Sequence, residues 1–177
     1  AYFACDVSFM TNVQQHFRPA IDLAETRMVI LTRKGNPHGI RGLADLGTTR
    51  LRLGVANEEQ SALGALTSRL LRRLGLYDAL RPNVAVQTPT ADLLVNQLRA
   101  GGLDAAIVYQ ANTSQVRDHL DVIPIEGPEA LAVQPYAVGQ SSEHAQLMTR
   151  LLEALTTDAS RRRFVEAGFG WRAPTSH

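Results

Sequence analysis

The sequence predicts an α/β protein that folds into two lobes. Its middle alternates strand-like and helix-like segments, and two loop sequences with glycine and proline separate this middle from both ends. Most of the strand-like segments are continuous apolar runs, which is typical of strands covered on both faces in a parallel sheet. The middle therefore fits a sheet whose strands are joined by right-handed helical crossovers.

Segments rich in valine, isoleucine and alanine are predicted to be strands. In chain order they are Tyr2–Phe9, Met28–Thr32, Leu51–Val55, Val84–Gln87, Asp104–Tyr109, Val122–Ile125 and Ala130–Val138. Pro135 lies in the last of these segments, which fits a crossing or edge strand better than a central one.

Apolar residues that recur at helical spacing predict helices between and after these strands. They are Leu63, Leu66, Leu70 and Leu74, then Ala91, Leu94, Val95 and Leu98, then Leu147, Leu151 and Leu155, followed by a shorter helix from Asp158 to Gly168. Thr90 suits the N-cap of the second helix, and Gly75 and Gly101 stand where the first and second helices should end. The C-terminal end is therefore predicted to be purely helical.

Two linkers define the expected lobes. They are the Gly35-Asn36-Pro37 and Glu126-Gly127-Pro128 sequences. We expect residues 1–32 and 131–177 to form a discontinuous first lobe, and residues 33–130 to form the second. Two crossing strands would then join the lobes.

Composition and motifs exclude several classes of function. The 177 residues carry a net charge of only +1 with scattered Lys and Arg, which argues against nucleic-acid binding, and no apolar run is long enough to span a bilayer. Cys5 is the single cysteine, and no nucleophile elbow, phosphate-binding loop or pair of carboxylates indicates an enzyme. The histidines lack the spacing of metal ligands; they are His16, His38, His119, His144 and His177.

Two predicted helices begin directly after a strand, and this arrangement favours an anion site. The unpaired N–H groups of a helix start attract anions, and both helices should open at the carboxyl edge of one sheet. The candidate residues are Ser61 and Leu63 at the first start and Thr90 and Ala91 at the second, with the hydroxyl of Tyr109 at the end of the next strand.

A purely structural interpretation of these residues stays open. Thr90 could serve only to cap its helix, and Tyr109 could be a half-buried aromatic side chain. Glu58 and Glu59 would oppose an anion at the first helix start if they pointed into the site.

Several segments, in this order and spacing, resemble the periplasmic molybdate-binding proteins of ABC transporters over nearly the whole chain. They are ACDVSFM at Ala4–Met10, ILTRKGNPHGIRGLADL at Ile30–Leu46, LGVANEEQSALG at Leu53–Gly64, LLVNQLRAGGLDAAIVY at Leu93–Tyr109, VQPYAVG at Val133–Gly139 and FVEAGFGW at Phe164–Trp171. The resemblance implies a type II periplasmic-binding-protein fold with the anion in a cleft between lobes. It also implies that the family's first strand and helix precede Ala1, so that the first lobe is incomplete.

The resemblance implies the roles of individual residues. Family members grip the oxyanion through neutral donors, and Tyr109 falls on the family's tyrosine. Leu63 and Ala91 fall on positions that donate backbone N–H groups. Ala4 stands where the family usually has a serine, which leaves the N–H of Ala4 or Cys5 as a donor. The Cys5 thiol is either a weak donor or a small buried hydrophobe.

The implied function is capture of molybdate or tungstate and its delivery to an ABC transporter permease. We expect a periplasmic monomer without a cofactor, without nucleic-acid binding and without insertion into the membrane. Molybdenum would be held only as its oxyanion, with no direct coordination of a metal by the protein. The alternative is the effector-sensing domain of a cytoplasmic transcriptional regulator with the same fold. An enzyme is the third and weakest class, and we expect none, because nothing in the sequence pairs a nucleophile with a base.

Overall fold

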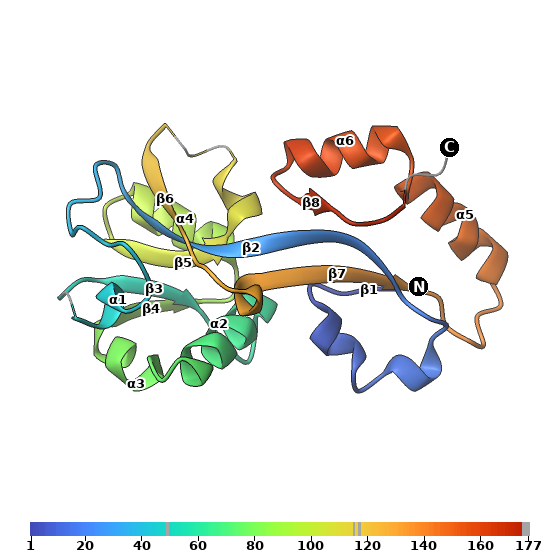
Figure 1. The fold of residues 1–177 in the computed structure, drawn as a ribbon, viewed down its shortest axis with the longest axis horizontal. Helices are drawn as coiled ribbons and strands as arrows, with labels where there is room; N and C mark the ends of the chain where they lie inside the picture. Colours follow the sequence, from blue (N-terminus) through green and yellow to red (C-terminus); the bar gives the residue numbers. More distant parts are fainter. Residues whose placement is uncertain (49, 115, 117, 175–177) are drawn as a thin grey trace. The chain divides into compact units, whose positions relative to one another are not determined.

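A computed structural model describes residues 1–48, 50–114, 116 and 118–174 of the chain (Figure 1). It divides into two compact units, and each is described by itself. Unit 1 comprises Ala1–Thr26 with Ala132–His177, and unit 2 comprises Arg27–Leu131. The chain passes from one unit to the other within strand β2 (Ile21–Arg33) and again at the start of β7 (Leu131–Ala137).

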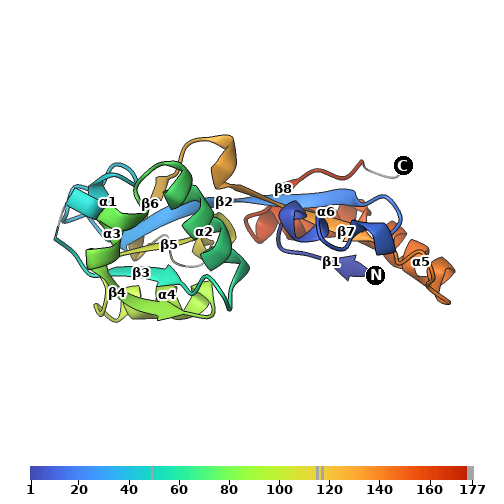
Figure 2. The same cartoon turned by 90° about the horizontal axis from the view of Figure 1, so that it is seen from below.

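Unit 2 is built around a mixed sheet. Its strands lie in the order β6, β2, β5, β3, β4, and β3 runs parallel to both of its neighbours whereas β2 is antiparallel to β5 and β6. Helices α2 and α4 cover opposite faces of this sheet (Figures 1 and 2). The elements of this unit besides β2 are α1 (Asp45–Thr48), β3 (Leu53–Ala56), α2 (Ala62–Arg73), α3 (Tyr77–Leu80), β4 (Val84–Thr88), α4 (Ala91–Arg99), β5 (Ala105–Tyr109) and β6 (Leu120–Pro124).

The burial of their residues explains where these strands and helices lie in the unit. All four residues of β3 are buried, as expected for a strand between two neighbours with a helix on each face. Strand β4 alternates between partly buried and exposed residues before it ends at the buried Thr88, which fits its position at the edge of the sheet. The predicted apolar faces of α2 and α4 are buried, except that Ala91 is only partly buried and that Leu74, which lies past the end of α2, is 50% exposed.

Unit 1 contains the remaining strands. Strand β7 lies between β1 and β2, and β2 pairs on its other side with β8. The elements are β1 (Tyr2–Phe3), α5 (Ala145–Leu155), α6 (Asp158–Glu166) and β8 (Gly170–Trp171). The buried core of this unit is small. Its described buried cluster consists of Leu23, Ala24, Tyr136, Val138 and Ala173.

Short 3-10 helices complete the described chain. They are η1 (Val7–Met10), η2 (Gln14–His16), η3 (Arg81–Asn83), η4 (Gln110–Thr113) and η5 (Pro128–Ala130).

Three sequence-based predictions of secondary structure are wrong in part. The predicted strand Tyr2–Phe9 stops at Phe3, because the Asp6 side chain accepts a hydrogen bond from the backbone N–H of Ser8 and begins η1. The strand predicted at Met28–Thr32 is only the second half of the longer β2. The C-terminal end is not purely helical, since β8 pairs with Ala24 and Glu25.

Candidate functional site

Two helices of unit 2 begin at the carboxyl ends of neighbouring parallel strands. Strand β3 leads into α2, and β4 leads into α4. Ser61 and Thr90 occupy the two N-cap positions, and both have extended backbone angles. Neither hydroxyl accepts a hydrogen bond from its own helix, whereas Thr157, at the N-cap of α6, does accept one from Ser160. The two candidate helix starts are therefore left uncapped by their own side chains.

Asn57 shapes the loop between β3 and α2. Its side-chain oxygen accepts hydrogen bonds from the backbone N–H groups of Glu59 and Gln60, at 3.0 and 3.1 Å. The backbone N–H of Asn57 donates to the carbonyl of Thr88 at the end of β4, at 2.8 Å. This residue therefore fixes the path into α2 and also ties together the ends of the two strands.

Gly64 lets α2 approach this loop closely. A Cβ atom at this position would overlap the backbone carbonyl of Asn57 and press on that of Ala56. The helix start is therefore held against the carboxyl end of β3 by a contact that only glycine permits.

Glu58 does not point toward the start of α2. Its carboxylate accepts hydrogen bonds from the hydroxyl of Ser68 and from the guanidinium of Arg72, both well inside the helix. The Ser68 hydroxyl, followed by Arg72, lowers the pKa of the Glu58 carboxyl below its ordinary value. Arg72 also stacks over the ring of Tyr77, 4.2 Å from its centre. The negative charge of Glu58, although not that of the exposed Glu59, is thus held to one side.

Tyr109 ends β5 at the same edge of the sheet. It is half-buried and pairs with Met28 of β2. Just beyond it, the side-chain N–H of Asn112 donates to the carboxylate of Asp92 in the first turn of α4, at 3.0 Å. Hydrogen bonds therefore link the end of β5 to the start of α4, just as Asn57 links β3 to β4.

Ala4 and Cys5 belong to unit 1. The N–H of Ala4 is already engaged, because it donates to the carbonyl of Pro135 at 3.3 Å. The carbonyl of Cys5 accepts from the side chain of Gln134 at 3.2 Å, and the Cys5 residue is exposed. The interpretation of Cys5 as a buried hydrophobe is therefore wrong.

Asn57 and Gly64 were not among the predicted site residues, although an asparagine directly after a strand is a recognisable turn signal.

Unit 2 also contains a cavity of about 560 Å³ that was not predicted. Asn57, Glu58, Glu59, Gly64 and Gln87 line this cavity, together with residues of α2 and α3, whereas none of the predicted site residues of unit 2 does. Within the described part of the chain, no cluster of three or more His, Cys, Asp or Glu could hold a metal ion. No helix in these residues is long and apolar enough to cross a membrane.

Comparison with known proteins places this geometry in context. Residues 2–170 match the family described as bacterial extracellular solute-binding protein. The molybdate-binding protein ModA of Mycobacterium tuberculosis is 32% identical over 152 residues, which are 84% of this chain and 55% of that protein. The chain spans little more than half the length of the curated relatives that it matches.

Solved structures agree on the fold. The periplasmic molybdate-binding protein of Azotobacter vinelandii superposes with a TM-score of 0.70 at 17% identity, covering 96% of this chain and 77% of that one. PEB3 of Campylobacter jejuni, bound to L-phospholactate, gives 0.73 at 16% identity, covering 96% and 78%. The predicted α/β class, in the form of the type II periplasmic binding proteins, is confirmed.

Proposed function

Because the chain belongs to the family of bacterial extracellular solute-binding proteins, we propose that it binds a tetrahedral oxyanion, molybdate or tungstate, and delivers it to the permease of an ABC transporter. The oxyanion is itself the cargo, and no cofactor takes part. The proposal includes an extracytoplasmic, monomeric protein whose two units act as the lobes of the binding protein.

The observation that carries this proposal is the pair of uncapped helix starts at Ser61 and Thr90. The first N–H groups of a helix need acceptors, and an oxyanion can supply them in place of a side chain. Both starts follow parallel strands at one sheet edge, where α/β proteins bind their ligands. The N–H groups of Leu63 and Ala91 are the proposed backbone donors.

The contacts of two carboxylates near this edge favour an anion, although Glu59 remains exposed there. The carboxylates of Glu58 and Asp92 are each held by a partner, namely Arg72 and Asn112. The remaining donors are hydroxyl and backbone N–H groups, together with the phenol of Tyr109. Neutral donors bind a dianion selectively through their geometry and still allow its release. Ala4 and Cys5 are the proposed donors of unit 1. The N–H of Ala4 must break its hydrogen bond to the carbonyl of Pro135 before it can bind an anion.

Titration calorimetry and melting temperature test the ligand. Molybdate and tungstate should bind with one site per chain and raise the melting temperature as their concentration increases above Kd. Sulfate and L-phospholactate serve as competitors of different size and shape. Binding of L-phospholactate in preference to molybdate would contradict the proposed ligand, and so would the absence of any response to molybdate and tungstate.

Tyr109→Phe tests the location of the site. Loss of one hydroxyl donor should weaken molybdate binding about tenfold, as is typical of a hydrogen bond to a charged group. Tyr2→Phe is the matched control, because Tyr2 lies in β1 of unit 1 and belongs to none of the proposed donors. Equal affinity of the two variants would show that Tyr109 is not part of the site.

A further inference from the structure

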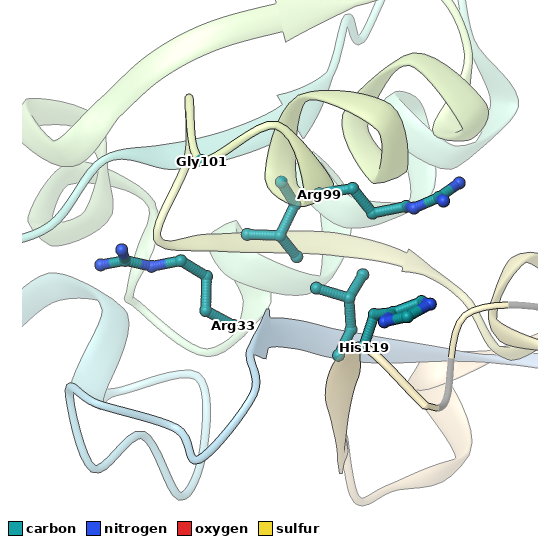
Figure 3. Close-up of a pocket in the computed structure, with 6 residues that line it drawn as sticks. Arg33, Arg99, Gly101 and His119 are labelled. Atoms are coloured by element: carbon teal, nitrogen blue, oxygen red, sulfur yellow. The ribbon is translucent and has the colours of Figure 1, made fainter.

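A second cavity lies at the opposite end of the unit 2 sheet. It has a volume of about 410 Å³ and is lined by Arg33, Leu98, Arg99, Gly101, His119 and Leu120 (Figure 3). Arg33 ends β2 and pairs with Leu120 of β6, whereas Tyr109 pairs with Met28 near the other end of β5. The length of β5 separates the two ends by roughly 13 Å, so this cavity is distinct from the proposed oxyanion site.

The polar side chains that line this cavity are basic. Arg99 and His119 are exposed, and neither side chain forms an ion pair or hydrogen bond with another described residue. In Figure 3 both extend toward the same side, whereas the guanidinium of Arg33 turns the other way. Among the described residues that line the cavity there is no carboxylate, and the carbonyl of Gly101 already accepts from Arg52 at 2.9 Å. The lining therefore offers donors without competing acceptors.

Arg33 lines the cavity but is not among the groups that can hold an anion together with Arg99 and His119. One terminal nitrogen of its guanidinium is bound to the carboxylate of Asp104 at 2.8 Å. The guanidinium also turns away from Arg99 and His119 (Figure 3).

The remainder of the lining is apolar. Leu98 and Leu120 are almost fully buried, with 1% and 3% of their surface exposed. These two side chains close the wall of the cavity and expose almost no surface to it, so the size of the cavity, rather than apolar contact, indicates the kind of ligand. The cavity volume is also in the range of small-molecule sites and far larger than one oxyanion.

We propose that this cavity binds a small organic anion, a carboxylate or phosphate monoester, independently of the oxyanion site. Arg99 and His119 hold the anionic group, and the organic body fills the remaining volume of the cavity. Arg99 also lies in the last turn of α4, where its charge complements the helix dipole.

Binding of phenyl phosphate to the molybdate-treated chain tests this site. Phenyl phosphate should bind with one site, and benzyl alcohol and inorganic phosphate should each bind at least tenfold more weakly. Amide NMR shifts should change at Gly101 and Leu120. Binding of benzyl alcohol as tight as that of phenyl phosphate would overturn the proposal, and so would shifts confined to other residues.

Arg99→Gln and His119→Gln complete the test. Arg99→Gln should weaken phenyl phosphate binding about tenfold, and His119→Gln should weaken it several-fold. Both variants should leave molybdate binding and the melting temperature unchanged. Arg69→Gln is the matched control, because Arg69 is an exposed arginine of unit 2 outside the cavity. If the three variants bind phenyl phosphate equally, the cavity is not its site. Because the readout is phenyl phosphate, this result is independent of whether molybdate binds at all.

Discussion

Gly64 packs directly on the carbonyl of Asn57, and this contact sets how close α2 comes to the strand that precedes it. Asn57 in turn donates its N–H to Thr88, so the contact reaches the end of the neighbouring strand. A helix start can hold an anion only if its N–H groups stand at the correct distance. The pair therefore connects backbone packing to the proposed binding geometry.

Gly64→Ala should weaken both folding and oxyanion binding. The added methyl group must displace α2 or the loop, which costs about 1–3 kcal/mol in overpacked sites. Molybdate affinity should fall at least about tenfold, since the N–H groups of α2 move with the helix. Gly42→Ala is the control, because no atom lies within 4 Å of a Cβ at that position. Calorimetry and denaturant unfolding of both variants provide the measurement, and unchanged affinity in Gly64→Ala would contradict this role.

Two threonines at helix N-caps should respond differently to substitution. Thr157 caps α6 through its hydroxyl, so Thr157→Ala should lower the free energy of unfolding by about 1 kcal/mol without changing molybdate affinity. Thr90 makes no capping bond, so Thr90→Ala should change stability by less than about 0.5 kcal/mol. Its molybdate affinity should nevertheless fall several-fold. The opposite pattern would mean that Thr90 is a structural cap only.

The sequence predicted the helices that frame the site because their signals are local. The leucine spacing of α2 and α4 and the glycines after them mark both elements, and Gly75 and Gly101 do adopt positive φ angles at the helix ends. Strand β8 was missed because two residues carry no pattern, and it forms only through its pairing with β2. The α1 and α3 helices, with four residues each, are too short for the same reason.

The candidate site was predictable only in outline. A strand followed by Ser61 or Thr90 indicates a helix start, and this signal lies in the sequence itself. Three features of the site depend on packing between segments. The two hydroxyls do not cap their helices, Glu58 turns toward Ser68 and Arg72, and Gly64 contacts Asn57. Spacing along the chain contains no information about such contacts, and the basic cavity at Arg99 and His119 was missed for the same reason.

Asp104 should make the stability of unit 2 depend on pH in the acid range. Its carboxylate accepts from the side chain and backbone N–H of Arg52 and from Arg33, and these contacts hold its pKa well below the ordinary value, with the Arg52 side chain contributing most. Because the folded pKa is lowered, the stabilisation is fully present above the unfolded pKa of about 3.9 and is lost as pH falls toward the folded pKa.

Asp104→Asn should therefore destabilise the protein at pH 7, by about 1–3 kcal/mol for lost charged hydrogen bonds. The difference from the unmodified protein should shrink as the pH falls below about 4. Asp78→Asn is the control, since Asp78 is exposed and forms no side-chain hydrogen bond or ion pair with the described residues. Urea unfolding at several pH values measures this, and a difference that stays constant down to pH 2 would refute the linkage.

The two faces of α5 should contribute unequally to unit 1. Leu152 packs against the buried cluster of Leu23 and Tyr136, whereas Leu147 points outward and is 57% exposed. Leu152→Ala should lower the free energy of unfolding by about 1–2 kcal/mol, less than for a fully buried leucine because Leu152 is only partly covered. Leu147→Ala should change it by less than about 0.5 kcal/mol.

The single tryptophan makes this comparison direct. Trp171 packs against the same cluster, so its fluorescence reports the unfolding of unit 1. Both substitutions remove the same atoms from the same helix, so helix propensity cancels between them, and only the contacts of the two side chains differ. Equal losses of stability would mean that the face of α5 carrying Leu147 is covered in solution, contrary to its exposure in the structure.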